Sequence, residues 1–263
     1  MIFQAWARTD VGKYRTLNED CHLVDADNGL ILVFDGMGGH LAGEVASRLA
    51  METMAEFYKR YAGNRTEVVP RLDNYDPAFS YHCNVLRHAV FEANRVVLEK
   101  SLQTQQLSGM GSTVAGMAIR EFTVSTINVG DSRIYLIRNN MIEQISIDHT
   151  LANDQVERGV MTPEEAYDSD LRHVLSSVIG VDTEVQVHVD ELSLLPADIF
   201  LLCTDGLTAV MKDDEILTEI RKTEVGPETL DRLIDEANRR GGPDNVTVAL
   251  VVVSDNSAAR MKF

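Results

Sequence analysis

The sequence predicts an α+β fold, because strand-like segments and long amphipathic helices occur in separate runs along the 263 residues. Hydrophobic residues make up 44% of the chain and charged residues 25%, which is typical of globular proteins and excludes disordered, collagen-like and disulfide-stapled classes. No repeat, low-complexity tract or Gly/Ser-rich linker divides the chain. We therefore expect a single domain over residues 1–263.

The first part of the chain contains one buried strand and two helices. Leu30–Phe34 is an uninterrupted apolar run of strand length. From Leu41 to Tyr61 apolar residues recur at a spacing of four, which predicts an amphipathic helix. A second helix is expected from about Tyr81 to Gln103, after a connection over residues 62–79 that contains Gly and Pro.

The middle of the chain changes to a composition typical of strands. We expect a meander of four strands, at Thr113–Arg120, Phe122–Val129, Arg133–Arg138 and Met141–Ile145. Asn139-Asn140 indicates a hairpin turn between the last two of these strands. Residues 150–180 are more polar, and Thr162-Pro-Glu-Glu165 has the pattern of a capped helix start.

The last third returns to strands and then helices. Strands are expected at Val185–Val189 and Ile199–Cys203, and Val246–Val253 is expected to be a fully buried final strand. Asp213 is expected to cap one helix, and Pro227 to open another that Gly241-Gly242 ends.

The chain is strongly acidic, with 24 Lys+Arg against 41 Asp+Glu and a formal net charge of −17. This disfavours nucleic-acid and membrane-surface binding, because both kinds of partner attract basic residues. No apolar run approaches the roughly 20 residues of a membrane helix, and no secretory signal is visible. Three scattered cysteines fit reduced thiols. We expect a cytoplasmic protein.

Aspartates recur at the ends of the apolar strand segments. Any one of them alone is typical of a turn. Several together would converge at one edge of a sheet and repel one another unless cations or protons compensate. Hard oxygen ligands select Mg²⁺ or Mn²⁺, so the pattern predicts a binuclear hydrolase. The four aspartates in this placement are Asp35, Asp131, Asp205 and Asp244.

A further charged group lies near the N-terminus, where Arg15 is followed by Asn18-Glu19-Asp20. Arginine offers a fork of donors that matches phosphate oxygens. Glu19 or Asp20 could hold metal-bound water. A surface charge cluster is the alternative interpretation of these residues on their own.

Distinctive blocks contain these acidic residues in order from residue 15 to 247: Arg15-Thr-Leu-Asn-Glu-Asp20, Val33-Phe-Asp-Gly-Met-Gly-Gly-His40 with Gly43-Glu44, Met110-Gly-Ser-Thr113, Asn128-Val-Gly-Asp-Ser-Arg-Ile-Tyr135, Asp148-His149, Leu202-Cys-Thr-Asp-Gly-Leu207 and Gly242-Pro-Asp-Asn-Val-Thr247. The ordered set resembles the metal-dependent Ser/Thr protein phosphatases of the PPM class, type 2C, in their bacterial form. The resemblance implies a sandwich of two antiparallel sheets flanked by helix pairs on both sides, and two Mn²⁺ or Mg²⁺ ions at one end.

The resemblance also implies roles for individual residues. Asp35 would bridge both metals, and Gly36 would offer its carbonyl oxygen. Asp205 and Asp244 would complete one metal's shell.

The remaining acids would act less directly. Glu19 and Asp20 would act largely through bound waters, and Asp131 would share with Asp205 a third, weaker metal site. Arg15 would bind the substrate phosphate. Residues from about 150 to 180 correspond to the family's flap, which borders the cleft.

The implied reaction is hydrolysis of phospho-Ser and phospho-Thr in proteins, with Arg15, Asp35 and Asp205 as catalytic residues. Our hypothesis is that two metals about 4 Å apart acidify a bridging water, which attacks phosphorus directly. Met37 stands where many eukaryotic members have His, and the nearby His40 is expected to make local contacts, so no general acid is assigned. Cys203 is expected to be a buried thiol rather than a nucleophile.

Two other functions remain open. The aspartyl-phosphate hydrolases are disfavoured, because Asp205-Gly-Leu-Thr208 lacks their second Asp. A pseudophosphatase that acts as a regulatory interaction module is weakened, because every expected ligand position holds an acid. We expect the partners to be phosphoproteins made by a Ser/Thr kinase, and the chain to be a monomer.

Overall fold

The structure, a computed structural model, describes residues 1–38, 42–62 and 75–255. Its centre consists of two five-stranded antiparallel sheets. Sheet 1 has the order β1 (Ile2–Asp10), β12 (Val246–Ser254), β11 (Ile199–Cys203), β8 (Arg133–Arg138) and β9 (Met141–Gln144). Sheet 2 has the order β10 (His188–Ser193), β7 (Thr123–Val129), β6 (Val114–Arg120), β3 (Leu30–Phe34) and β2 (Cys21–Asp25).

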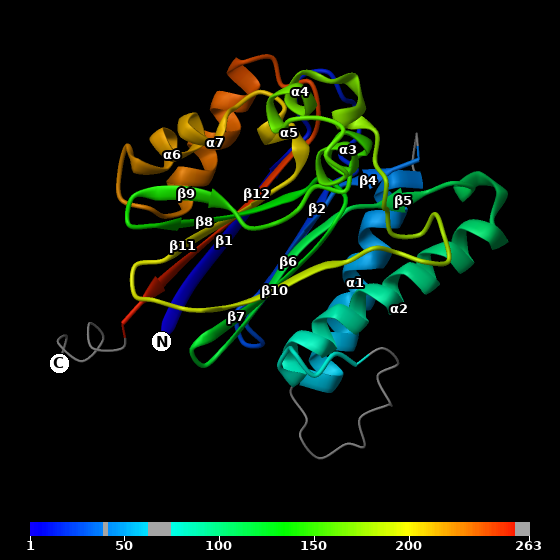
Figure 1. Ribbon diagram of the computed structural model, residues 1–263, viewed down its shortest axis with the longest axis horizontal. Coiled ribbons are helices and arrows are strands. Elements are labelled where there is room, and N and C mark those ends of the chain that lie inside the picture. The colour runs from blue at the N-terminus through cyan, green and yellow to red at the C-terminus, as the bar shows by residue number, and fades with distance from the viewer. Residues whose placement is uncertain (39–41, 63–74, 256–263) are drawn as a thin grey trace.

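Helices cover the outer face of each sheet (Figure 1). The pair α1 (Ala42–Ala62) and α2 (Tyr81–Gln103) packs on sheet 2. The short α5 (Asp205–Thr208) and the pair α6 (Asp213–Arg221) and α7 (Pro227–Arg239) pack on sheet 1. The predicted sandwich with flanking helix pairs is therefore confirmed.

Alternating side chains of β3 explain why this strand is apolar throughout. Leu30, Leu32 and Phe34 pack toward α1 and α2, whereas Ile31 and Val33 pack against sheet 1. Because both faces are covered, burial favours an apolar residue at every position. The expected bounds of β3, α2, β8 and β11 are confirmed, and those of the other predicted helices and strands differ mostly by one or two residues.

Two smaller features complete the fold, a short pair of strands that follows Asp35 and the turn of the β8–β9 hairpin. The two-residue strands β4 (Gly36–Met37) and β5 (Gly111–Ser112) pair with each other. Asn139 and Asn140 both have positive φ, as the predicted hairpin turn between β8 and β9 requires.

Some expectations were wrong. The four middle strands do not form one meander, because β6 and β7 belong to sheet 2 and β8 and β9 to sheet 1. The strand expected at Val185–Val189 begins only at His188. Lys212, and not Asp213, is the residue before α6. The sequence reasoning also missed β1 and β2, whose residues are mostly half-buried or exposed.

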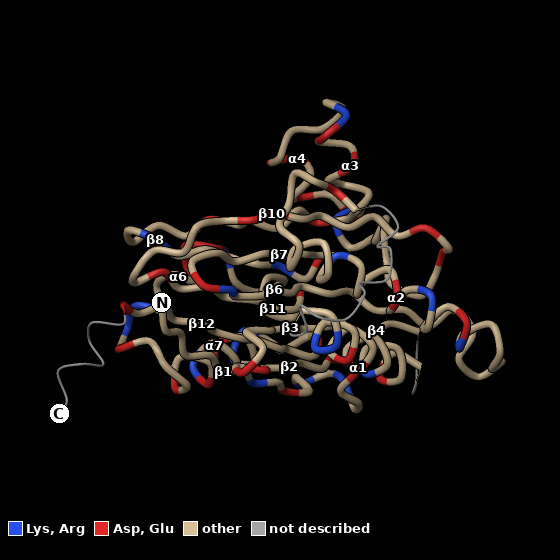
Figure 2. The backbone as a smooth tube through the Cα atoms, turned by 90° about the horizontal axis from the view of Figure 1, so that it is seen from below, with Lys and Arg blue, Asp and Glu red and all other residues tan. Residues whose placement is uncertain are grey.

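The expected flap, residues 150–180, contains three short helical segments. They are α3 (Leu151–Glu157), α4 (Pro163–Asp168) and the 3₁₀ turn η2 (Asp170–His173). The predicted capping box of Thr162 and Glu165 opens α4, whereas α3 was not predicted. Figure 2 shows α3 and α4 projecting from the body of the sandwich.

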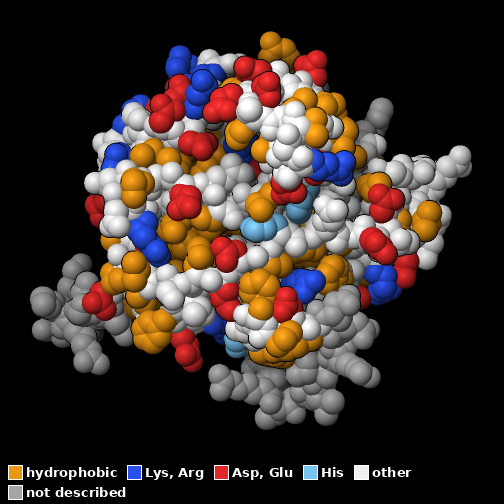
Figure 3. Space-filling view, in the orientation of Figure 1, with side chains coloured by type: hydrophobic (Ala, Val, Ile, Leu, Met, Phe, Trp, Pro, Cys, Tyr) orange, Lys and Arg blue, Asp and Glu red, His pale blue; other side chains and the backbone are white. Residues whose placement is uncertain are grey.

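The acidic residues are not gathered on one visible face. Figure 3 shows acidic and basic side chains interspersed across the surface seen in that view. Among the described helices, none combines the length and apolar character that crossing a membrane demands. The single-domain boundary at 1–263 stays a prediction.

Candidate active site

Loops at one end of the sandwich bring the predicted aspartates together. Asp35 directly follows β3, and its pKa is raised well above the usual value by burial and by four other carboxylates. These carboxylates belong to Asp20, Asp131, Asp205 and Asp244. The convergence predicted from strand ends is therefore present in the structure.

Asp20 is held by two threonine hydroxyls in a buried position before β2. Thr204 Oγ1 donates to Asp20 Oδ2 at 2.9 Å, and Thr247 Oγ1 donates to the same oxygen at 2.7 Å. The side chain is only 7% exposed, and burial raises the pKa of Asp20 to about 7 although the two hydrogen bonds lower it. The hydroxyls fix the orientation of this carboxylate.

Among the residues that the structure describes, three buried oxygens of the site find no hydrogen-bond partner: Glu19 Oε1, Asp20 Oδ1 and Asp205 Oδ1. A buried polar atom without a partner is costly, because it has lost its hydrogen bonds to water. The pKa of Asp205 is raised by burial and by the charge of Asp244, and is partly lowered by a hydrogen bond with Asp35. Such a set of oxygens is suited to a cation.

Glu19 and Gly36 are packed closely against α1. Ser47 Oγ in α1 donates to the Glu19 carbonyl oxygen at 2.6 Å. A Cβ at Gly36 would clash with the carbonyl oxygens of Gly43 and Glu19, so only glycine fits there. Burial raises the pKa of the Glu19 carboxyl, with a backbone hydrogen bond from Gly43 opposing it. The loop of Glu19 therefore has a fixed position beside Gly36.

Arg15 lies at the edge of the same site. Its Nη2 donates to Asp244 Oδ2 at 2.7 Å, and this contact raises the pKa of the Arg15 guanidinium. The arginine side chain is about half exposed, at 52%. It therefore presents positive charge both to the acidic site and to solvent.

Asp131 lies in the turn that crosses from β7 in sheet 2 to β8 in sheet 1. The turn is held by His149, whose backbone N donates to the Gly130 carbonyl at 2.9 Å and whose Nδ1 accepts from Gly130 N at 3.2 Å. Burial, followed by the charges of Asp205 and Asp148, raises the pKa of Asp131 well above its usual value. Asp131 and Asp205 are therefore close enough to interact.

The donor set fits a hydrated divalent ion better than a ligand cage built from side chains alone. Within residues 1–38, 42–62 and 75–255, no three His, Cys, Asp or Glu side chains form a ready metal-ligand group. A metal among these acids would need carbonyl oxygens or waters in addition. Mg²⁺ typically keeps several waters, and Gly36 offers a carbonyl at the site. The acids and their unpartnered oxygens are consistent with that coordination.

Several hydrogen-bonding residues of the site were not predicted. Thr204 and Thr247 were assigned no role, although each stands within a distinctive block that contains an aspartate. Asn245 was also assigned no role, yet its Oδ1 accepts from Glu19 N at 2.8 Å. Its Nδ2 donates to the carbonyls of Val11 and Leu17, so it connects the loops that carry Arg15 and Glu19.

The remaining predictions concern a general acid and a thiol. Met37 is partly exposed, and His40 lies outside the described residues. Cys203 is fully buried in sheet 1, and burial raises its pKa to about 12. The expected burial of this thiol is confirmed, and its lack of a nucleophilic role stays a prediction.

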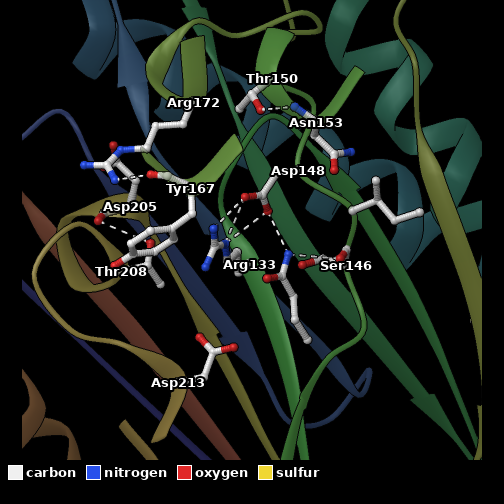
Figure 4. A network of polar contacts seen from close by, with 12 residues as sticks. Arg133, Ser146, Asp148, Thr150, Asn153, Tyr167, Arg172, Asp205, Thr208 and Asp213 are labelled. Atoms are coloured by element: carbon white, nitrogen blue, oxygen red, sulfur yellow. Dashed lines mark hydrogen bonds and ion pairs between the residues drawn. The ribbon is translucent and has the colours of Figure 1, made fainter. Parts of the chain in front are cut away.

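A cavity of about 370 Å³ extends from Asp131 and Asp205 to the flap. Figure 4 shows Tyr167 and Arg172 of the flap near Asp205, and Arg133 and Asp148 pointing toward each other. Arg133 donates through Nη2 to Asp148 Oδ2 at 2.7 Å. The acidic site is thus continuous with a pocket that the flap encloses.

Comparison with known proteins agrees with this geometry. Residues 13–251 match the family model described as protein phosphatase 2C. The chain belongs to the protein phosphatase 2C family. This finding confirms the predicted family and enzyme class.

Individual members of the protein phosphatase 2C family match nearly the whole chain. The chain is 32% identical over 247 residues to the serine/threonine phosphatase stp of Listeria monocytogenes, and the match covers 93% of each protein. The structure of Stp1 from Staphylococcus aureus is 31% identical, with a TM-score of 0.83 over 97% of this chain and 96% of that one. The catalytic domain of PstP, in complex with two manganese ions, is 33% identical, with a TM-score of 0.79 over 97% and 99% of the chains.

Proposed function

We propose that this member of the protein phosphatase 2C family hydrolyses phospho-Ser and phospho-Thr in proteins, with two Mn²⁺ or Mg²⁺ ions at the aspartate site. One observation carries the proposal: aspartates from separate loops share one site, in which, among the described residues, buried oxygens of Asp20 and Asp205 lack hydrogen-bond partners. The serine/threonine phosphatases among the relatives, and the manganese in PstP, support it.

The positions of the acids support separate roles for them. Asp35, which interacts with four other carboxylates, would help to hold both ions, and Gly36 would offer its carbonyl oxygen. Asp205 and Asp244 would hold one ion, and Asp20 and Glu19 would orient bound waters. When bound, the ions would acidify a water molecule for attack on phosphorus and offset charge on the phosphoryl oxygens.

Arg15 is placed to bind the substrate phosphate at the edge of the site. Its guanidinium contacts Asp244 through Nη2, and half of the side chain is open to solvent. A guanidinium can bind phosphate through two parallel hydrogen bonds. Asp131, beside Asp205, would contribute to a third and weaker metal site. The opposing Ser/Thr kinase, the monomeric state and the cytoplasmic location remain predictions.

Substitution of the central aspartates tests this proposal. Asp35→Asn and Asp205→Asn should lower Mn²⁺-dependent turnover of p-nitrophenyl phosphate by about 10²–10³-fold or more, since each removes electrostatic stabilisation at the reacting group. Asp190→Asn is the matched control, because Asp190 lies on the edge strand β10 and outside the acidic site.

The outcomes separate the proposal from its alternative. EDTA should abolish turnover, and Mn²⁺ should restore it. Near-normal turnover in both site variants would contradict the metal assignment. A folded wild-type chain that has no turnover with any divalent ion, but still binds phosphoproteins, would favour the pseudophosphatase.

A further inference from the structure

Two cations contact one exposed aromatic ring at the mouth of the cavity. Tyr167, in α4 of the flap, is 51% exposed. The guanidinium carbon of Arg172 lies 5.4 Å from the centre of its ring, and Lys212 Nζ lies 5.5 Å from the same centre. Both distances are within the range of cation–π attraction. The ring thus gathers positive charge from the flap and from the residue before α6.

The position of Arg172 is fixed by further contacts. Its Nη1 donates to the Tyr167 carbonyl oxygen at 2.5 Å, and its Nε donates to His173 Nε2 at 2.9 Å. Figure 4 shows Arg172 reaching back over Tyr167 in this way. Binding to a side chain that is already held in place costs less conformational entropy than binding to a free one.

Neither cation forms an ion pair with any residue that the structure describes. In the part of the chain that the structure describes, no carboxylate lies within 4 Å of the charged nitrogens of Arg172 or Lys212. By contrast, many other cations have such a partner: Arg8, Arg15, Arg48, Arg95, Arg133, Arg138, Lys222, Arg239 and Arg240. Glu215 accepts from the Lys212 backbone N at 2.8 Å, and this hydrogen bond and the charge of Lys212 lower the pKa of the Glu215 carboxyl, so this carboxylate interacts with Lys212 without a close ion pair. In a chain with a net charge of −17, two adjoining cations without a close ion pair are available for an anion from outside.

Arg172 lies in the same cavity as the acidic site, and Lys212 reaches this cavity through its contact with the Tyr167 ring. Tyr167 and Arg172 line the cavity whose other end contains Asp205 and Asp131. Apolar side chains form part of the wall between these ends, including those of Ala152, Val156, Pro163 and Ala166. A peptide whose phosphorylated residue reaches Asp205 can therefore extend along this wall toward Tyr167.

We propose that Arg172 and Lys212, seated on Tyr167, bind an anionic side chain that flanks the phosphorylated residue of the protein substrate. The anion is a carboxylate or a second phosphate group, both of which accept hydrogen bonds from guanidinium and ammonium groups. The preferred substrates are phosphosites with acidic neighbours. This inference rests on the proposed phosphatase activity and specifies its substrate class.

Phosphopeptides that differ only in one flanking residue test the proposal. Each peptide carries one phosphoserine and, at successive positions on either side of it, glutamate, alanine, lysine or a non-hydrolysable phosphonate analogue of phosphoserine. With Mn²⁺, kcat/KM for the best glutamate peptide should exceed that for its alanine counterpart by at least about two- to fivefold, the effect of one exposed charge pair. The lysine peptide should be the poorest, and the preference should weaken as salt screens the charges.

Variants of the two cations assign the preference to this surface. Arg172→Gln and Lys212→Gln should each lower the glutamate-to-alanine ratio of kcat/KM by about two- to fivefold, and the double variant should bring the ratio close to one. Arg158→Gln is the matched control, because Arg158 is an exposed cation that follows α3 in the flap but does not line the cavity. It should leave the ratio unchanged.

The outcomes also separate this inference from the proposed function. Metal-dependent turnover of the alanine peptide by the wild-type chain tests the phosphatase activity alone. Given that turnover, equal rates for glutamate, phosphonate and alanine peptides at every position would overturn the anion site. So would an unchanged ratio in the double variant, or an equal loss in Arg158→Gln. A preference confined to the phosphonate peptides would support the site and identify its ligand as a second phosphate.

Discussion

Replacing Thr204 with valine tests whether Asp20 is oriented for a metal ion by its neighbours. Valine keeps the β-branched shape of threonine but removes the hydroxyl that donates to Asp20 Oδ2 at 2.9 Å. One hydrogen bond to a charged group contributes about 1.5–3 kcal/mol, which corresponds to roughly 10- to 100-fold in an equilibrium constant. The second donor, Thr247, remains at 2.7 Å, so the carboxylate should lose orientation rather than leave the site.

We therefore expect the Mn²⁺ dissociation constant of Thr204→Val to rise by about 10- to 100-fold, as is typical when a residue that orients a metal ligand is removed. Calorimetric titration of Mn²⁺ into metal-free protein measures this directly. Thr204 Oγ1 also accepts from Thr247 N at 2.9 Å. The free energy of unfolding in EDTA should accordingly fall by about 1–3 kcal/mol, because that buried N–H loses its acceptor.

Thr9→Val is the matched control. Thr9 Oγ1 hydrogen-bonds Thr247 Oγ1 at 2.7 Å, so the same substitution acts one hydrogen bond further from Asp20. Its effect on Mn²⁺ affinity should be several-fold smaller. If Thr204→Val bound Mn²⁺ within twofold of wild type, or if Thr9→Val lost as much affinity, the reasoning about Asp20 would be wrong.

Three other predictions follow from single contacts. Arg15→Ala should mainly raise KM for a phosphopeptide, since we propose that Arg15 binds the substrate phosphate; an unchanged KM would remove that role. Cys203→Ser should retain turnover, and the wild-type thiol should resist alkylation in the folded protein, because burial raises the pKa of Cys203 to about 12. The pKa of His149 is lowered, first by burial and then by the charge of His188, against the opposing charges of Asp148 and Asp154. Its contribution to the free energy of unfolding is therefore complete above the unfolded pKa of about 6.5 and is lost as pH falls toward the lower folded value. Urea unfolding in EDTA should show that the free energy of unfolding falls less below about pH 6.5 in His149→Gln than in wild type.

Strands covered on both faces were the most predictable parts of the fold. Two such strands, Ile199–Cys203 and Leu30–Phe34, are apolar throughout. Each packs against the opposite sheet on one face and against helices on the other, and burial selects apolar residues on both faces. By contrast, β1 has only one other strand beside it and includes exposed or half-buried polar residues such as Gln4 and Arg8. Its pairing with β12 depends on contacts that no local pattern reveals.

The wrong meander has a specific cause. Gly130 has a φ of +87°, and its missing side chain lets the chain pass close to Thr113 while it crosses from sheet 2 to sheet 1. Four strand-like segments in succession are compatible with one sheet or with two. Which sheet each segment joins depends on which strand faces pack together, and this packing is a property of the whole fold.

The site was predictable for the acids and not for the hydroxyls that hold them. Four aspartates that each follow or precede an apolar strand stand out together, although any one of them alone is typical of a turn. Threonine is common in strands, so the residue type did not single out Thr204 and Thr247. Their common partner, Asp20, is 184 residues from Thr204 and 227 from Thr247.

The buried acids also change the meaning of the net charge of −17. That figure counts every carboxyl as ionised, whereas burial and mutual repulsion raise the pKa values of Asp20, Asp35, Asp131 and Asp205. Without cations, Asp20, whose pKa is raised to about 7, is partly protonated near neutral pH, so the charge is less negative than the formal one. Two divalent ions would bring four positive charges, favour the ionised carboxylates and release those protons. Metal affinity should therefore depend on pH. The electrostatic field that acts on substrates from a distance comes from the carboxylates outside this cluster.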